Sequence, residues 1–253
     1  MKVIALGSGT SQGIPIIGCT CKTCTSGDIR DFRLRSSVHI KTNNNAFQID
    51  VGPDFRQQFL VNKLTTVDHV LITHEHNDHI IGIDDLRAIN FTQKKSIPIY
   101  AEARVLESIK ERFHYAFGKH KYPGAPQITL HTITNEPFTL NGEEIIPIRL
   151  MHGNLPILGF KIGDFAYITD ASDIEPSEIN KIKGINTLII NALQREDHRS
   201  HFNLKEALLF INKINPRQAY LTHISHRMGP FNNWAKHLPE NVEPLQDNMV
   251  ITL

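Results

Sequence analysis

Three histidines and one aspartate crowd into a single short segment of this 253-residue sequence, THEHNDH. The segment directly follows the apolar run HVLI, which is predicted to be a buried strand. Residues two apart in an extended segment point the same way, so His74 and His76 can bind one metal ion. Asp78 and His79, at the start of the next predicted helix, can reach a second ion. Imidazole and carboxylate groups suit zinc, manganese or iron, so the segment predicts a metal site rather than an ordinary polar loop.

Three further candidate ligands stand at the ends of later predicted strands. His152 occurs in LMHGN, Asp170 in ITDAS and His223 in LTHISH. Alone, such a histidine is more often structural, and such an aspartate more often belongs to a turn or a helix cap. Because each of the three follows a predicted strand, together they favour the metal-ligand interpretation.

The H-x-H-x-D-H pattern at a strand-to-helix junction resembles the metallo-β-lactamase superfamily, and the resemblance runs along the whole chain. It implies an α/β fold, a four-layer αβ/βα sandwich with metals at one edge of its two sheets. It also implies a dinuclear centre whose first metal is held by His74, His76 and His152, whose second is held by Asp78, His79 and His223, and in which Asp170 bridges. Two such metals can share a hydroxide that attacks the substrate, so the implied reaction is metal-assisted hydrolysis.

All three cysteines lie in the segment GCTCKTC, as Cys19, Cys21 and Cys24. Three thiols cannot all pair as disulfides, and a tetrahedral metal site needs a fourth ligand. This segment, with the loop GTSQGIP before it and LTHISH near the C-terminus, resembles the cyclic phosphodiesterases of the carbon–phosphorus lyase pathway, which open 5-phospho-α-D-ribosyl 1,2-cyclic phosphate. The resemblance implies that His226 completes the set. A Cys3His set leaves no position open for water, which indicates a structural zinc.

Hydrolysis also needs a general acid, because the leaving alkoxide must be protonated. The superfamily uses a histidine shortly before a late helix, and RSHFNL places His201 there, although Phe202 and Asn203 depart from the subfamily's usual residues. We therefore predict His201 and the metal ligand Asp78 as catalytic residues. His198 stays open as the alternative acid. The loop over residues 118–126, GKHKYPGAP, is interpreted either as a lid that brings His120, Lys121 and Tyr122 to a phosphate or as an ordinary surface loop.

Short strands must end near one another to bring these residues together. Strands are predicted over residues 2–6, 37–41, 46–51, 69–73, 97–101, 128–132, 144–151, 158–162, 165–169, 187–191, 219–222 and 249–253. Helices are predicted over residues 53–62, 80–91, 102–117, 203–214 and 231–237. Many short strands with helices between them predict two sheets with helices outside, in one domain spanning residues 1–253.

Composition limits the classes of partner. A net charge of +1 gives little electrostatic attraction for nucleic acid. The apolar run near the N-terminus is four residues long, too short for a signal peptide or a membrane span. With clustered cysteines and no secretion signal, we predict a cytoplasmic location and no membrane contact.

The leading functional hypothesis is a phosphodiesterase that opens small cyclic phosphates or phosphodiesters. Its expected cofactors are two divalent ions, zinc or manganese and conceivably iron, together with one structural zinc. A small-molecule phosphodiester is the expected partner, nucleic acid is not favoured, and a homodimer is left open. Two alternatives remain: a nuclease resembling ribonuclease Z, which usually adds a basic arm that is not apparent here, and a non-catalytic metal-binding module.

Overall fold

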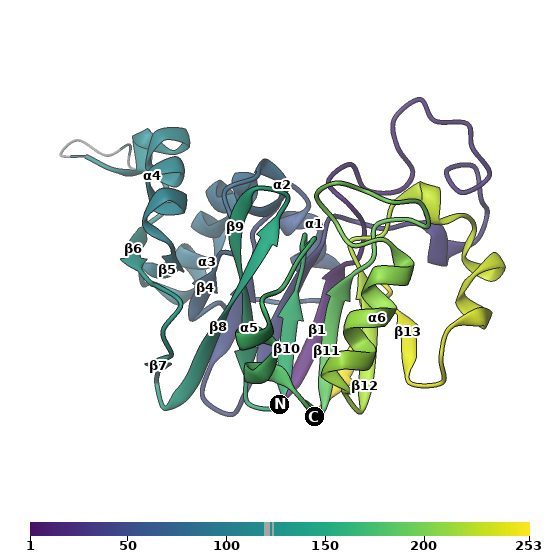
Figure 1. The fold of residues 1–253 in the computed structure, drawn as a ribbon. Coiled ribbons are helices and arrows are strands. Elements are labelled where there is room, and N and C mark those ends of the chain that lie inside the picture. Colours follow the sequence, from purple (N-terminus) through teal and green to yellow (C-terminus); the bar gives the residue numbers. More distant parts are fainter. Residues whose placement is uncertain (119–121, 123) are drawn as a thin grey trace.

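Two seven-stranded sheets form the centre of the protein in a computed structural model that describes residues 1–118, 122 and 124–253 (Figure 1). The first sheet has the order β14-β1-β2-β3-β4-β5-β6, with bounds Val250–Thr252, Lys2–Gly7, Ser37–Lys41, Ala46–Ile49, His69–Leu71, Ile97–Ala101 and Ile128–Thr132. The second has the order β13-β12-β11-β10-β9-β8-β7, with bounds Val242–Pro244, Gln218–Thr222, Thr187–Asn191, Phe165–Ile168, Leu155–Ile162, Glu143–His152 and Phe138–Leu140. Strands β3 to β6 are parallel, as are β10 to β13, so their carboxyl ends share an edge.

Helices cover the outer face of each sheet and complete four layers. Helices α1, α2, α3 and α4 lie on the first sheet, over Phe55–Val61, Asn77–Ile80, Leu86–Gln93 and Ala103–Arg112. Helices α5 and α6 lie on the second, over Pro176–Ile182 and Leu204–Ile214. This arrangement confirms the predicted αβ/βα sandwich.

Three apolar clusters hold the layers together. Two of them fill the space between a sheet and its helices. The third lies between the two sheets and contains Phe47, Phe160, Phe165 and Tyr167, all fully buried. Such side chains supply most of the free energy of folding, roughly 1.5–3 kcal/mol for each fully buried large apolar group. The sheets are therefore fixed rigidly against each other, which suits an edge that must hold side chains in position.

The helix expected over residues 80–91 is interrupted. After α2 the chain makes a 3-10 turn over Ile81–Asp85 before α3 begins. Backbone groups of this segment bond to the neighbouring strand end instead of to the helix, because Gly82 N donates to Val51 O and Val51 N donates to His79 O. A Cβ atom at Gly82 would lie 2.0 Å from Gly52 O, so only glycine permits this close approach. These contacts hold the end of the HEHNDH segment next to the first sheet.

Other differences concern short elements. The helix expected over 102–117 ends at Arg112, because Phe113 turns its backbone out of helical geometry and buries its ring. The segment 231–237 forms two 3-10 turns, Phe231–Asn233 and Ala235–His237. Sequence analysis missed α5 and the strands β7 and β13. Each of these strands has only three residues, too few for an alternating pattern to be recognised.

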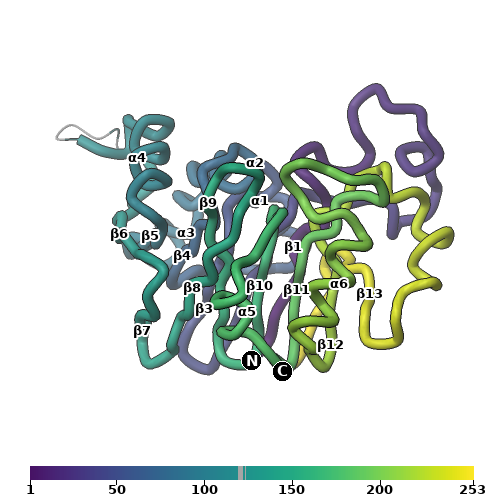
Figure 2. Tube along the Cα trace, viewed as in Figure 1, coloured from purple at the N-terminus to yellow at the C-terminus, as the bar shows by residue number. Residues whose placement is uncertain are grey.

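Both chain termini lie together at the edge opposite the parallel strands' carboxyl ends (Figure 2). Met1 N donates to Leu253 O at 3.0 Å. The edge that bears the candidate ligands therefore lies at the end of the sandwich away from both termini.

Candidate active site

All seven candidate active-site ligands lie at the carboxyl-end edge of the two sheets. The first sheet contributes the HEHNDH segment, which follows β4 and forms α2. The second sheet contributes His152 at the end of β8, Asp170 after β10 and His223 after β12. The structure brings them into two groups whose donor atoms lie within 4.8 Å of one another: His74, His76 and His152; and Asp78, His79, Asp170 and His223.

The second group is a buried cluster of opposite charges. His79 Nδ1 lies 2.6 Å from Asp50 Oδ2, and its Nε2 lies 3.1 Å from Asp78 and 3.5 Å from Asp170. Burial disfavours a charged ring, yet the three carboxylates raise the pKa of His79 well above its usual value. His79 Nε2 is buried and has no hydrogen-bond partner. An unpartnered donor atom among carboxylates fits a divalent cation, which would take the place of the proton.

The first group is also oriented by hydrogen bonds behind it. His152 Nδ1 donates to the carbonyl oxygen of Ser200 at 2.6 Å, so its Nε2 is the atom able to bind a metal ion. His74 Nδ1 bonds to Thr73 Oγ1 at 2.9 Å, and its Nε2 faces His76 Nδ1 at 3.0 Å. Burial and the positive neighbour His79 lower the pKa of His74 well below its usual value, so the ring is a neutral ligand. These features are those of a metal site with its outer hydrogen bonds already formed.

Asp170 lies between the two groups. Its Oδ1 lies 2.9 Å from His223 Nδ1, while its Oδ2 lies 3.5 Å from His79 Nε2 and 3.8 Å from His74 Nε2. Although burial opposes ionisation, His223 and His79 hold the pKa of Asp170 well below its usual range. One ionised carboxylate therefore reaches both groups.

Three non-glycine residues of the site have left-handed backbone conformations. Asp50 has a φ of 61°, Asp170 of 59° and His223 of 55°. L-residues rarely adopt this region, and each instance costs on the order of 1–3 kcal/mol. At Asp50 the neighbouring strand β4 helps to hold this conformation, because Asp50 N donates to Leu71 O.

His201 lies over both groups of ligands. Its ring centroid is 4.5 Å from that of His152 and 4.9 Å from that of His223. Its Nδ1 is buried without a hydrogen-bond partner. A ring nitrogen of His201 also lies close enough to His152 and Asp170 for these three residues to hold a metal ion. Burial lowers the pKa of His201 to about 3. His198 lies further out, with its ring 5.1 Å from His201.

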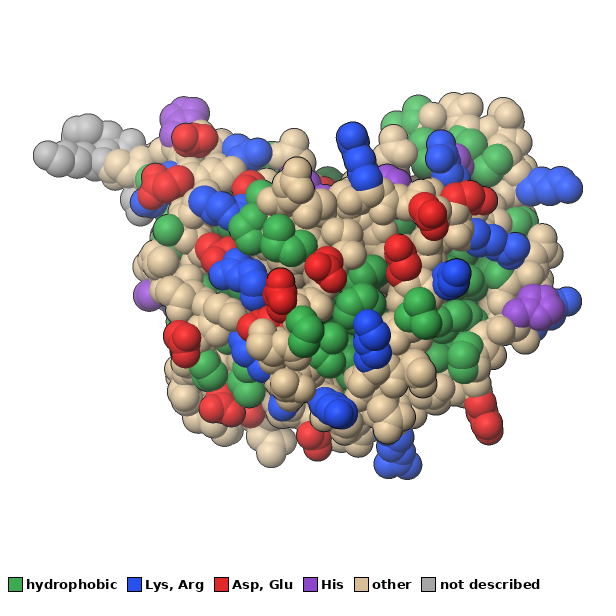
Figure 3. Space-filling view, viewed as in Figure 1, with side chains coloured by type: hydrophobic (Ala, Val, Ile, Leu, Met, Phe, Trp, Pro, Cys, Tyr) green, Lys and Arg blue, Asp and Glu red, His purple; other side chains and the backbone are tan. Residues whose placement is uncertain are grey.

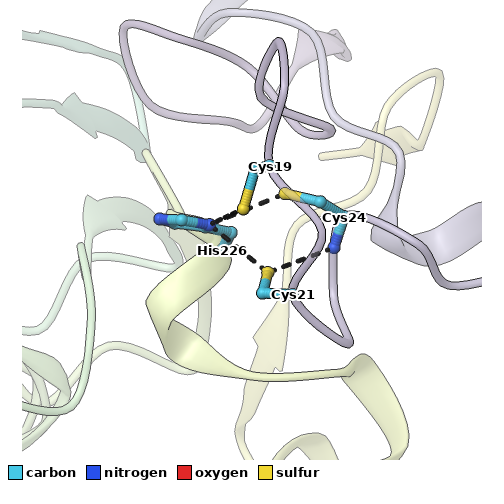
Figure 4. A group of neighbouring side chains, drawn as sticks. All are labelled: Cys19, Cys21, Cys24 and His226. Atoms are coloured by element: carbon cyan, nitrogen blue, oxygen red, sulfur yellow. Dashed lines mark hydrogen bonds between the residues drawn. The ribbon is translucent and has the colours of Figure 1, made fainter.

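The three cysteines and His226 converge on one point, although more than 200 residues separate them in sequence (Figure 4). The sulfur atoms of Cys19, Cys21 and Cys24 lie 3.3, 3.4 and 3.6 Å from His226 Nδ1. In a tetrahedral zinc site with usual bond lengths, sulfur and nitrogen ligands lie about 3.6 Å apart, so the set fits zinc. The backbone N–H of Cys24 lowers the pKa of the Cys21 thiol to about 6, which favours the thiolate that binds metal.

Backbone hydrogen bonds connect the cysteine site with the histidine edge. Ile224, between the candidate ligands His223 and His226, donates to Ser8 O, and Thr10 N donates back to Ile224 O. Thr10 Oγ1 lies 3.3 Å from His223 Nε2, and Thr23 Oγ1 donates to His226 O at 2.9 Å. The N-terminal loop therefore contacts both clusters.

Sequence analysis missed Asp50, which follows β3 and bonds both to His79 and to the hydroxyl of Thr73. The only sign of Asp50 in the sequence is a carboxylate at a strand end, in the segment IDVG. No fixed spacing connects that segment with HEHNDH. Of the loop residues considered near a phosphate, His120 and Lys121 lie outside the described residues, and Tyr122 is exposed.

The fold and the site together define a metallo-β-lactamase type of protein. The sequence pattern described as the β-lactamase superfamily domain matches residues 45–224. The chain belongs to this superfamily. Its fold and its relatives support a hydrolase, and its His/Asp clusters are able to bind metal ions.

Individual relatives differ in name. A crystal structure of a diphosphatase from the PhnP family is 33% identical, with a TM-score of 0.93, and the alignment covers 100% of this chain and 97% of the other. A Porphyromonas gingivalis protein named octanoyltransferase is 41% identical over 98% of this chain, which spans only 51% of that relative's length. A ribonuclease Z of Methanococcus maripaludis is 23% identical, over 83% of this chain and 67% of the relative.

The helices of the described residues differ from membrane-spanning ones. Every helix there is too short or too polar to cross a lipid bilayer.

Proposed function

We propose that this chain is a dinuclear metal-dependent hydrolase that cleaves a P–O bond in a small phosphodiester, cyclic phosphate or diphosphate. The observation that carries the proposal is the position of Asp170. Its Oδ1 lies beside His223, and its Oδ2 lies near both His79 and His74, which belong to different groups. A carboxylate that reaches both groups suits a pair of metal ions better than one isolated structural ion.

In this proposal His74, His76 and His152 would hold one ion, Asp78, His79 and His223 would hold the other, and Asp170 would serve both. When bound, two divalent ions would supply Lewis acidity toward the phosphoryl oxygens and would lower the pKa of water. The protein's own task is to fix the ligands. Asp50 orients His79, Thr73 orients His74, and the carbonyl of Ser200 orients His152.

His201 is the proposed general acid. It lies above both groups, so it can reach an oxygen that leaves from a phosphorus atom held between them. Burial keeps the ring neutral in the absence of substrate, since the pKa is lowered to about 3. An anionic phosphate beside the ring would raise this pKa, because a nearby negative charge favours the protonated imidazole. Proton donation would therefore be coupled to substrate binding.

The choice of a small phosphate substrate rests on the Cys3His cluster and on the relative named as a diphosphatase of the PhnP family. Both agree with the predicted resemblance to the cyclic phosphodiesterases of the carbon–phosphorus lyase pathway. The relative named octanoyltransferase is about twice as long as this chain, so its activity can reside in the part that has no counterpart here. Acyl transfer is therefore treated as a competing outcome.

The test is a substrate panel on purified protein of known metal content. We expect turnover of 5-phospho-α-D-ribosyl 1,2-cyclic phosphate or of ADP-ribose, with weaker turnover of bis(p-nitrophenyl) phosphate, and about three metal equivalents per chain. Processing of precursor tRNA without small-diester turnover would overturn the proposal in favour of a nuclease. Hydrolysis or transfer from an octanoyl thioester alone would favour acyl chemistry. Bound metal without turnover of any ester would indicate a binding module.

A further inference from the structure

Two side chains of the HEHNDH segment are held by α4 rather than by the group of candidate ligands. Glu75 accepts a hydrogen bond from Arg104 Nη1, and Asn77 Oδ1 accepts one from Arg112 Nε at 3.1 Å. Glu75 stands between two candidate ligands of the first group, and successive residues of an extended segment point to opposite sides. Helix α4 therefore contacts the segment on the side away from the ligand atoms.

The same arginine that holds Glu75 also reaches the second sheet. Arg104 Nη2 donates to the backbone carbonyl of Pro156, near the start of β9. Beside this contact a backbone bond joins the two sheets, because Leu158 N donates to Thr73 O at 3.1 Å. From that bond to the arginine, the contacting residues move by two positions in opposite directions along the two segments, as in an antiparallel pair. Arg104 thus continues the contact between the sheets through its side chain.

The first group of candidate ligands is divided between the two segments that Arg104 joins. His74 and His76 belong to the segment after β4, whereas His152 ends β8. Strand β8 pairs with β9 so that Met151 lies opposite Pro156, which places the contact of Arg104 next to His152 in the pair of strands. The ring centroids of His76 and His152 are 5.1 Å apart. The gap that an ion would occupy therefore depends on how the HEHNDH segment lies against β8 and β9.

A second ion pair fixes the position of Arg104. Glu102, directly before α4, accepts from both Nη atoms of Arg149 on β8, at 2.9 and 2.6 Å, and lies 3.6 Å from Arg104 Nη2. The side chains of Arg104, Glu75, Arg149 and Glu102 are only 17–32% exposed, so solvent and salt screen them less than a fully exposed pair. In the space-filling view, basic and acidic side chains lie close together below the lobe of α4 (Figure 3).

We propose that Arg104 is a positioning residue for the first group of metal ligands. By holding Glu75 from the first sheet and Pro156 from the second, it sets the gap between His76 and His152 and so determines how tightly that group holds an ion. The proposal rests on the pair of ions in the proposed function, but not on the substrate or on the reaction. A guanidinium group suits this role because its donors form a rigid fork that can hold two acceptors at once.

Chelator competition on the full-length, cobalt-loaded protein measures the ions without reference to turnover. Cobalt held by sulfur absorbs in the near ultraviolet, so the ion of the cysteine set can be followed separately from the ions of the histidine edge. In Arg104→Gln we expect one edge ion to bind about tenfold more weakly, as the loss of a contact behind a ligand predicts. The other edge ion and the ion of the cysteine set should keep their wild-type affinity. In the background of His76→Ala, which removes a ligand of the first group, Arg104→Gln should cause no further loss of affinity.

Two comparison variants separate a contact across the sheets from simpler roles. Arg112→Gln removes an arginine of the same helix that holds the same segment, but whose contacts, Asn77 and Ser108, lie on the side of the first sheet. It should change the affinity for either edge ion by less than about twofold. Arg104→Lys keeps the charge but loses the fork of paired donors, so it should recover little of the affinity that Arg104→Gln loses.

The outcomes separate this role of Arg104 from the proposed function. Unchanged affinity in Arg104→Gln, or full recovery in Arg104→Lys, would reduce the contact to an ordinary ion pair and overturn the positioning role, while the hydrolase proposal stands. Equal losses in Arg104→Gln and Arg112→Gln would show that α4 supports the segment without the second sheet. A parallel loss of all three ions would indicate general destabilisation, which also rejects the role. A wild type that binds no ion at the histidine edge would overturn both proposals together.

Discussion

The cysteine cluster and the histidine edge lie side by side, yet they use their ligand atoms differently. In the cysteine cluster three sulfur atoms surround one nitrogen, and the set is complete with four donors. At the histidine edge seven side chains supply donors to two groups, one carboxylate faces both, and His79 Nε2 and His201 Nδ1 are buried without partners. A closed set suits a structural ion, whereas an open set leaves positions for water and substrate.

Burial separates the two regions as well. Cys19, Cys21 and His226 are only half-buried, and most other residues of the loop around the cysteines are exposed or half-buried. His74, His79, Asp170 and His223 are almost completely buried against the rigid sheets. We therefore expect an ion at the cysteines to order the loop, and ions at the histidine edge to serve chemistry. The predictions below test this division.

The largest expected effect is that of Asp170→Asn. The amide keeps the shape but removes the charge that faces both groups of histidines, so binding of the active-site metals should weaken and kcat/KM should fall on the order of 10³-fold. Metal analysis should find that one zinc, the one held by the cysteines, stays with the protein. Asp173→Asn, three residues along on an exposed position, is the matched control. Full activity in Asp170→Asn would remove the bridging role.

A smaller loss, of about 10²-fold in kcat, is expected for His201→Ala, at the lower end of the usual contribution of a general acid. Metal content should stay as in the wild type, because all seven candidate metal ligands are untouched. His237→Ala, an exposed histidine in a C-terminal turn, provides the comparison. If His201→Ala loses metal together with activity, then His201 is a ligand, as its position beside His152 and Asp170 would also allow.

Cys21→Ser should act mainly on the other cluster. We expect the loss of about one zinc equivalent and a lower melting temperature, because the closed site depends on all four donors. Loss of this zinc should also reduce kcat by about tenfold, because His226 and Thr10 then hold His223 less firmly. Removing a contact behind a metal ligand typically costs about 10- to 100-fold. Lys22→Ala, in the same loop, should change neither property. Normal zinc content with normal activity would show that the cysteines are not ligands.

Much of the edge could be predicted from the sequence because spacing carries the information. HEHNDH is a dense local pattern, and each later candidate follows a recognisable apolar strand. Because parallel strands end at a common edge, strand ends far apart in sequence come together once the sandwich is known. The pairing of His226 with the cysteines came from the family resemblance, and their convergence on one point is a finding of the structure.

Other features have no local signal. Asp50 contributes to the site through a hydrogen bond with His79, 29 residues away in sequence. In the sequence such an aspartate cannot be distinguished from one that only forms a turn after a strand. The break between α2 and α3 depends on the contact of Gly82 with Gly52, which helical spacing over residues 80–91 does not reveal. The family resemblance favoured His201 over His198, and the structure adds that His201 is the more buried ring and lies beside His223. Tertiary contacts decided each case.

The smallest effect concerns a buried histidine that belongs to neither cluster. His39, on β2, bonds through Nδ1 to Gln48 Oε1 at 3.3 Å and packs edge-on against Phe59. Burial lowers its pKa from 6.5 to about 4. The unfolded chain therefore binds this proton at higher pH than the folded protein does. Its contribution to stability is complete above pH 6.5 and decreases as the pH falls toward 4, by up to about 3 kcal/mol.

Urea unfolding of the wild type and His39→Gln at pH 7 and at pH 5 measures this contribution. We compare the free energy of unfolding of the wild type with that of His39→Gln. Relative to the variant, the wild type should be about 2 kcal/mol less stable at pH 5 than at pH 7. Each unit of pH between 6.5 and 5 is worth about 1.4 kcal/mol. An equal difference at both pH values would mean that His39 does not titrate in this range. Because both proteins carry the same two clusters, loss of metal at low pH cancels in the comparison. His39 thus provides the reference for a buried imidazole without an ion, against which the acid sensitivity of the histidine edge can be judged.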